Sequence, residues 1–217
     1  MNHSTLQRRG FTFWQVVLVL ASLVILAALL FPLLGRTREN GHYPSCQSNL
    51  KQIMLGVRIY LQDYDEKYPL IALNAKTTQI QTGRSFVFGW ADSLQPYLKS
   101  TQIFQCPQEK TAPDSDPTHS GYTDYWFNAK MAGLKEKQLD AEALTIALSD
   151  GNSGDARSHL FAIPNSWRSD SNSPLYRHLN GANYAFGDGH VKWLSPDKWK
   201  NELDMQGGPT LRLKPKN

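Results

Sequence analysis

The strongest hydrophobic pattern in the chain is an uninterrupted apolar run from Phe11 to Gly35. No Asp, Glu, Lys, Arg or His occurs in this run. An α-helix rises about 1.5 Å per residue, so roughly 20 residues cross a hydrocarbon core of about 30 Å. The run therefore predicts a helix of membrane-spanning length.

A second helical pattern begins near Ser45. Apolar residues recur there at three- and four-residue steps, which makes one stripe that can pack on a sheet. The stripe consists of Leu50, Ile53, Met54, Val57, Tyr60, Leu61 and Tyr64. Between the two patterns, Asn40-Gly41 and Pro44 are signals that interrupt a helix. We therefore expect a linker or kink over residues 36–44.

Near the C-terminus, Asp188-Gly189 lies between two extended runs and predicts a β-hairpin. Asp-Gly is a strong hairpin signal, because both central residues of a type I′ turn need positive φ. With these two residues as the turn, strand alternation assigns each cross-strand pair to one face. The pairs expected on the core side are Tyr184 with Trp193 and Phe186 with Val191. The pair expected to face water is Ala185 with Lys192.

Three interpretations compete for the apolar run. A cleavable secretory signal has an apolar core of about 7–15 residues, so the run is too long for one. A plain single-pass anchor explains the length, but it does not explain the residues at the junction. There a polar leader with Arg8 and Arg9 meets Gly10 and Phe11.

The third interpretation does explain the junction. Arg8-Arg9-Gly10-Phe11-Thr12 resembles the class III signal of bacterial prepilins and type II secretion pseudopilins. The resemblance implies that a prepilin peptidase cuts after Gly10 and methylates the new N-terminal residue, Phe11. It also implies a pilin-like α+β fold, in which a long N-terminal helix packs on an antiparallel β-sheet. The implied location is the bacterial inner membrane, crossed once, with the N-terminus cytoplasmic and the globular domain periplasmic or extracellular.

The function implied by the resemblance is structural rather than enzymatic. The subunit would pack with other pilin or pseudopilin subunits in a type II secretion pseudopilus or a type IV pilus-like fibre. The family usually carries a glutamate where this chain has Gln15, and an amide cannot neutralise a neighbouring ammonium. A minor subunit is therefore expected. Pro32 lies where many pilins have a helix-bending proline, although prolines are also frequent in membrane helices generally.

These features divide the 217-residue chain into four parts. They are a leader (1–10), a transmembrane or assembly helix (11–35), the linker or kink (36–44) and a globular domain (45–217). The net charge of +4 is mild, and basic residues occur on both sides of the apolar run. Charge therefore does not fix the orientation, which follows only from the resemblance.

The C-terminal half resembles a large group of prepilin-like proteins that carry a His, nine residues, and then Asp-Gly. Here the motif is His178 with Asp188-Gly189, in the predicted hairpin 178–194. The resemblance implies a buried strand at Ala143–Gly151. Two interpretations of the motif stay open. His178 and Asp188 could serve as metal ligands or as an acid–base pair, or His178 could bond backbone near the turn while Asp188 shapes the turn.

An acidic cluster and two cysteines are further candidate sites. Asp63, Asp65 and Glu66 lie where the second helix should end, and their charge opposes the helix dipole. A bound Ca²⁺ could offset that charge, as could Lys67 in a solvated loop; no other cofactor is expected. In an oxidising compartment the cysteines could form a disulfide, and two buried free thiols are the alternative. The pair is Cys46 and Cys106.

Two rival functions also stay open. The first is a minor pilin that binds DNA or a glycan, since the aromatic cluster Tyr122–Phe127 could stack on bases or sugars. The chain has no basic run, so its nucleic-acid signal is weak. The second is a membrane-anchored enzyme that uses His178, Asp188 and Asp150, although no common catalytic motif accompanies these residues.

Overall fold

The structure, a computed structural model, describes residues 13–72 and 88–196, without the side chains of residues 30–43. The chain forms two compact units, residues 1–41 and residues 42–217. The predicted cleavage junction at Gly10 and Phe11 lies outside the described residues.

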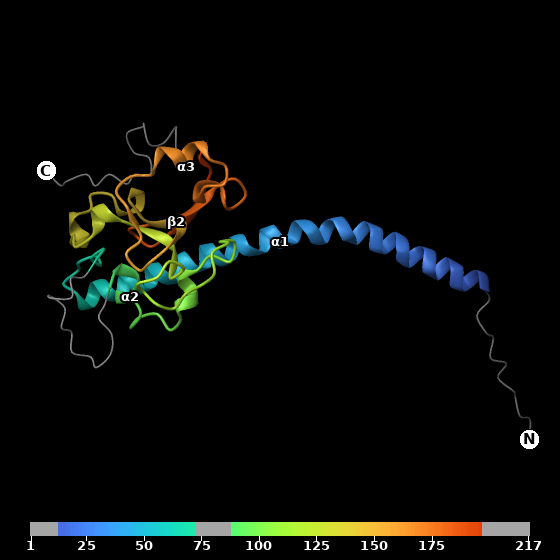
Figure 1. Cartoon of the computed structure of the whole chain (residues 1–217), viewed down its shortest axis with the longest axis horizontal. Helices are drawn as coiled ribbons and strands as arrows, with labels where there is room; N and C mark the ends of the chain where they lie inside the picture. The colour runs from blue at the N-terminus through green and yellow to red at the C-terminus, as the bar shows by residue number, and fades with distance from the viewer. Residues whose placement is uncertain (1–12, 73–87, 197–217) are drawn as a thin grey trace, which may run out of the picture. The chain divides into compact units, whose positions relative to one another are not determined.

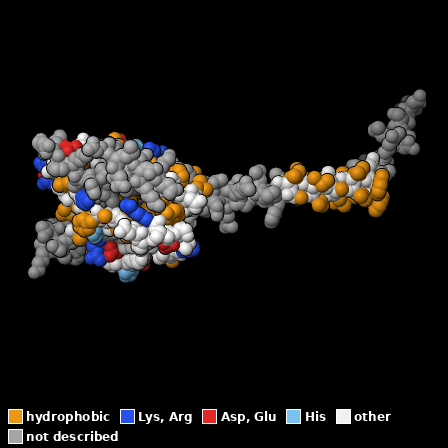
Figure 2. Space-filling model, turned by 90° about the horizontal axis from the view of Figure 1, so that it is seen from above, with side chains coloured by type: hydrophobic (Ala, Val, Ile, Leu, Met, Phe, Trp, Pro, Cys, Tyr) orange, Lys and Arg blue, Asp and Glu red, His pale blue; other side chains and the backbone are white. Residues whose placement is uncertain are grey.

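The longest element is helix α1 (Phe13–Asp63), and its first part belongs to the first unit. Between residues 13 and 29, most large apolar side chains are exposed, among them Trp14 at 70% and Leu29 at 69%. Figure 2 shows hydrophobic side chains in orange around this part of the helix. The apolar side chains of residues 13–29 are therefore largely not buried within the described part of this unit.

The predicted membrane span is not found. Within the described residues, no helix is long and apolar enough to cross a membrane. The predictions of a pilin-like membrane helix over residues 11–35 and of a single-pass inner-membrane protein are therefore wrong.

Helix α1 continues through residues 36–44, where the sequence predicts a linker or kink. A helix can contain Gly41 and Pro44, although glycine costs about 1 kcal/mol and proline about 3 kcal/mol relative to alanine. The boundary between the two compact units falls in the same segment, between Gly41 and His42. The segment is thus a boundary between units but not a break in the helix.

The second unit contains a five-stranded sheet with the order β3-β1-β2-β4-β5. The strands are β1 (Thr123–Asn128), β2 (Ile146–Gly154), β3 (His159–Leu160), β4 (Ala182–Phe186) and β5 (Val191–Leu194). Strand β3 pairs with β1 in parallel, whereas the other neighbours are antiparallel. The fold is α+β, but the expectation of an antiparallel sheet is wrong because the edge strand β3 makes the sheet mixed.

Short helices complete the second unit (Figure 1). The α-helices are α2 (Trp90–Ser93) and α3 (Asn165–Ser169). The 3₁₀ turns are η1 (Thr101–Phe104), η2 (Ala129–Met131), η3 (Glu136–Gln138), η4 (Glu142–Leu144) and η5 (Pro174–Tyr176). Short helical turns thus occur within the two longer connections between strands, β1 to β2 and β3 to β4.

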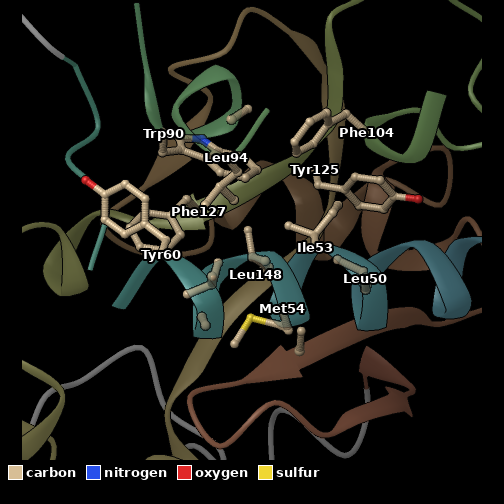
Figure 3. Close-up of a cluster of buried hydrophobic side chains, with 14 of the residues drawn as sticks. Leu50, Ile53, Met54, Tyr60, Trp90, Leu94, Phe104, Tyr125, Phe127 and Leu148 are labelled. Carbon is tan, nitrogen blue, oxygen red and sulfur yellow. The ribbon is translucent and has the colours of Figure 1, made fainter. Parts of the chain in front are cut away.

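Both faces of the sheet are buried. On one face the last turns of α1 pack against the sheet, and Figure 3 shows Leu50, Ile53 and Met54 among the aromatic side chains of this cluster. The predicted stripe is confirmed from Leu50 to Leu61, whereas Tyr64 is exposed. A second cluster lies on the opposite face and contains Trp126, Ile146, Ile163, Leu175, Ala182, Tyr184, Phe186 and Leu194.

The hairpin between β4 and β5 has a different turn from the predicted one. Only Gly189 of residues 187–189 has a positive φ, at +92°. The Phe186 N–H donates to the His190 carbonyl, and the Gly189 N–H donates to the Phe186 carbonyl. These bonds close a three-residue loop, which needs a single residue in the left-handed region, instead of a two-residue type I′ turn.

The longer loop shifts the strand register by one residue. Tyr184 pairs with Lys192 and Ala185 pairs with Val191. Ala185 is fully buried in the cluster that contains α1, because both faces of the sheet are covered, so the prediction that it faces water is wrong. Lys192, its predicted partner on the water side, is exposed.

Candidate metal centre

Four side chains from distant parts of the chain meet inside the second unit. Cys46 lies on α1, Cys106 follows η1, Asp150 lies on β2 and His178 follows η5. His178 and Asp150 are fully buried, and both cysteines are buried. Cys46, Cys106 and His178 each offer one ligand atom, and these three atoms lie within 4.8 Å of one another. These three residues therefore form a buried group that could hold a metal ion.

The apolar stripe of α1 positions Cys46. Cys46 precedes Leu50 by one helical turn, so both side chains point to the same side of the helix. Both are fully buried in the cluster that covers the sheet. Asn49, on the same helix, donates to the Gln105 carbonyl at 3.0 Å and holds the segment before Cys106 against α1.

Cys106 is fixed through its main chain. Its N–H donates to Oδ2 of Asp124 on β1 at 2.7 Å. Asp124 is itself buried, and loss of hydration raises its pKa to about 6. The sulfur of Cys106 is thus held beside the sheet by a buried carboxyl group.

A tight turn positions His178. The N–H groups of His178 and Gly181 donate to each other's carbonyls at 2.8 and 3.0 Å. Between them Leu179 and Asn180 both have positive φ, at 53° and 60°. This is the backbone of a type I′ turn, which the sequence assigned to Asp188-Gly189. Trp193 Nε1 also donates to the His178 carbonyl at 2.7 Å, so β5 supports the turn.

The imidazole of His178 presents one nitrogen to two partners. Its Nε2 lies 3.5 Å from Sγ of Cys106 and 3.3 Å from Oδ1 of Asp150. The other carboxylate oxygen of Asp150 accepts from the Asn183 N–H of β4 at 2.6 Å. Asp150 therefore links the histidine to the centre of the sheet.

The buried charges shift the pKa values of the group. Burial alone would lower the pKa of His178, but Asp150 and Cys106 raise it to about 9. The hydrogen bond with Cys46, together with that to His178, lowers the pKa of Cys106 to about 5. The hydrogen bond with Cys106, then burial and the charge of Cys106, raise the pKa of Cys46. Without a further cation, one thiol of the pair keeps its proton.

Arg177 adds a permanent positive charge that interacts with Asp150 and Cys106. It forms an ion pair with Glu109, and both side chains are largely buried. Burial alone would lower its pKa, but the surrounding anionic groups, Asp150 first among them, raise it. The positive charge of Arg177 beside the group is thus already paired with Glu109.

The two halves of the C-terminal motif lie in different environments. Asp188 is at the tip of the β4–β5 hairpin and accepts from the His190 N–H at 3.1 Å, while Gly189 supplies the positive φ. The interpretation of Asp188 as a turn residue is therefore the one that the structure bears out. His178 combines the two interpretations, because its backbone forms a turn and its side chain joins the buried group.

The acidic cluster after the second helix does not form a metal group. Asp63 accepts from the Tyr97 hydroxyl at 2.8 Å, and Asp65 lies 3.9 Å from Lys67 Nζ. Glu66 and Asp65 both have positive φ. Among the described residues, Cys46, Cys106 and His178 are the group close enough to share one ion. The Ca²⁺ hypothesis at Asp63, Asp65 and Glu66 thus gains no support.

The remaining predicted positions are distributed along α1 and β1. Gln15 is an exposed residue of α1, and Pro32 lies in α1 where side chains are not described. Both cysteines are free thiols, so the disulfide stays a prediction. The aromatic cluster 122–127 is buried in the two cores, which leaves no exposed rings there for stacking on a ligand.

The three-residue group itself was missed from the sequence. Cys46, Cys106 and His178 are separated by about 60 and 72 residues, unlike the short spacings of common zinc motifs. Comparison with protein-family models, with curated proteins and with solved structures finds no match for the chain.

Proposed function

We propose that this chain is a non-enzymatic structural subunit that assembles with other copies or related subunits through residues 13–29 of α1. The assembly is a fibre of the pseudopilus or type IV pilus-like kind, in which the chain is a minor subunit. Cleavage after Gly10 by a prepilin peptidase, with methylation of Phe11, precedes assembly.

The observation that carries the proposal is the exposed apolar surface of α1. Residues 13–29 contain no charged side chain, and Phe13 is 81% exposed. Exposed apolar patches larger than a few hundred Å² are rare in monomers and mark interaction surfaces. A helix that is apolar on all sides is stable when other elements surround it. The same stretch of neighbouring subunits, packed as a helical bundle, would provide that surrounding.

Local sequence features support close helix packing. Ala21, Ser22, Ala27 and Ala28 are small residues that let helix backbones approach each other. Ser22 bonds within its own helix, donating to the Val19 carbonyl at 2.8 Å, so it brings no unsatisfied hydroxyl to such an interface. The junction at Gly10-Phe11 adds the resemblance to prepilins.

The buried centre supports a non-enzymatic role. A Cys–His–Asp relay uses the two imidazole nitrogens for different partners. Here Cys106 and Asp150 both face Nε2 of His178. The three side chains are also buried, which keeps substrate away from them.

Site-specific crosslinking in the cells that make the protein tests assembly. In a Val19→Cys variant, oxidation is expected to give disulfide-linked dimers, because exposed residue 19 would face a neighbouring copy. The matched control is Asp170→Cys, an exposed position on the second unit. The wild type is a second control, since its two cysteines are buried. Equal crosslinking of the V19C and D170C variants would contradict the proposal.

Processing is tested separately by mass spectrometry of the N-terminus of the cellular protein. A mature chain that begins at methylated Phe11 is expected. A chain that keeps Met1, or that begins elsewhere, would contradict the processing step. Assembly would then be tested by the crosslinking result alone.

A further inference from the structure

We propose that Cys46, Cys106 and His178 bind one Zn²⁺ ion inside the second unit, with the Asp150 carboxylate beside the histidine. The ligand atoms are the two sulfurs and an imidazole nitrogen of His178, and they lie within 4.8 Å of one another. The site is independent of assembly through residues 13–29, because all three ligands belong to the second unit.

The distances between the ligand atoms fit this geometry. Zinc binds sulfur at about 2.3 Å and imidazole nitrogen at about 2.0–2.1 Å, which places the two atoms about 3.6 Å apart at a tetrahedral angle. The distance from Cys106 Sγ to His178 Nε2 is 3.5 Å. Oδ1 of Asp150 lies 3.3 Å from the same nitrogen, but it is not among the atoms that lie close enough to share one ion.

Hydrogen bonding alone explains these contacts poorly. Nε2 carries at most one proton, yet it faces both Cys106 Sγ and Asp150 Oδ1. Hydrogen bonds between a cationic N–H and a carboxylate are usually about 2.7–2.9 Å long. Among the described residues, Asp150 Oδ1 accepts no well-aligned hydrogen bond, although the side chain is fully buried. A shared cation would bind the nitrogen and both sulfurs, and it would place a positive charge beside this carboxylate.

The charges of the group lead to the same conclusion. Buried anions are stable when they are paired or when they coordinate a metal. Two thiolates and Asp150 would place three negative charges together, while nearby Arg177 is already paired with Glu109. A divalent cation would neutralise most of that charge.

The donor set selects the metal. Ca²⁺ and Mg²⁺ bind oxygen ligands, so two sulfurs exclude them. Copper(I) favours thiolates and thioethers, whereas zinc accepts sulfur, nitrogen and carboxylate oxygen in one tetrahedral site. All three ligands are buried, so the ion is structural. It would fasten α1 to the sheet and to the turn at His178.

Metal binding is measured on the full-length protein, purified without chelators and then supplied with Zn²⁺. We expect one Zn²⁺ per chain by elemental analysis, together with two thiols per chain after unfolding in a chelator. At a free zinc concentration of 100 times Kd, the melting temperature should rise by about 5–10 °C relative to the apoprotein. Substitution of Co²⁺ should give the sulfur-to-metal charge-transfer band and the intense visible bands of a tetrahedral site.

Variants identify the ligands. His178→Gln and Cys106→Ser should lower zinc affinity at least tenfold and abolish the charge-transfer band or weaken it. Asp150→Asn should lower affinity about 10–100-fold while the sulfur band is kept. The control is His119→Gln, which removes an exposed histidine that lies 3.0 Å from Asp114. This control variant should bind zinc as the wild type does.

Three results would overturn the proposal without any variant. They are two free thiols with no zinc bound, a Cys46–Cys106 disulfide in place of free thiols, and preferential binding of copper(I). If the His119→Gln variant lost as much zinc as the ligand variants do, the metal would be bound at the surface and not by the buried group. Because the wild-type measurements decide these outcomes, a variant that fails to fold does not prevent the test.

Discussion

At the residue scale, Asp124 shows how the fold shifts the chemistry of one group. It lies on β1 with 3% of its surface exposed, and its Oδ2 holds the N–H of Cys106. Burial raises its pKa from an ordinary value of 3.8 to about 6. A raised carboxyl pKa means that the folded state binds more protons than the unfolded state between these pH values. Stability from this residue is therefore lost as the pH rises through that window.

Replacement of Asp124 by asparagine should remove this pH dependence. Near pH 4, Asp124 in the folded wild type is mostly protonated and is therefore uncharged, as asparagine is in the variant. The free energies of unfolding of the two proteins should then be similar. Near pH 7 the Asp124→Asn variant should be more stable than the wild type by on the order of 1–3 kcal/mol. Urea unfolding at a series of pH values measures the difference. A constant difference across the window would show that burial of Asp124 does not set its pKa.

At the element scale, α1 has two kinds of leucine within a few residues of each other. Leu50 is fully buried against the sheet, whereas Leu55 is 62% exposed. Both are on the same helix, so their helix propensities are equal and only burial separates them. The pattern of three- and four-residue steps selects Leu50 and omits Leu55.

Alanine substitution should separate these two positions. Leu50→Ala should lower the free energy of unfolding by about 2–5 kcal/mol, because it removes buried methyl groups and leaves a cavity. Leu55→Ala should change it by less than about 0.5 kcal/mol, as is usual for exposed sites. Chemical denaturation of the purified variants measures both values. A comparable loss in the two variants would show that Leu55 contacts a surface outside this chain.

At the scale of the whole molecule, the chain consists of an exposed apolar helical unit and a unit with its own cores. The two hydrophobic clusters and the five strands of the described residues lie within residues 42–217. Folding of the second unit therefore draws on contacts within itself, while the first unit supplies the apolar surface proposed for assembly.

A fragment of residues 42–217 should fold alone. We expect a cooperative thermal transition and a monomeric mass in solution, whereas the longer chain self-associates through residues 13–29. Light scattering and circular dichroism of the two proteins provide the comparison. If the fragment is unfolded, residues before His42 contribute to its stability; if it associates as strongly as the full chain, assembly uses another surface.

The hydrophobic pattern determined the two parts of α1, the buried face of its last turns and the uncharged stretch that ends near Gly35. These are local properties, because the spacing of apolar residues along one helix is sufficient to show them. The resemblance at Gly10-Phe11 and the motif at His178 were also visible along the chain. A hairpin near Asp188-Gly189 was predicted correctly, although its register was not.

The tertiary structure decided what depends on geometry across the chain. One extra loop residue at Gly187–Gly189 set the register of β4 and β5, and the parallel pairing of β3 made the sheet mixed. The meeting of Cys46, Cys106, Asp150 and His178 could not be read from spacing, because the residues lie on four separate segments. Their proximity follows from how α1 packs on the sheet, since distances between segments are set by the folded core and not by separation along the sequence.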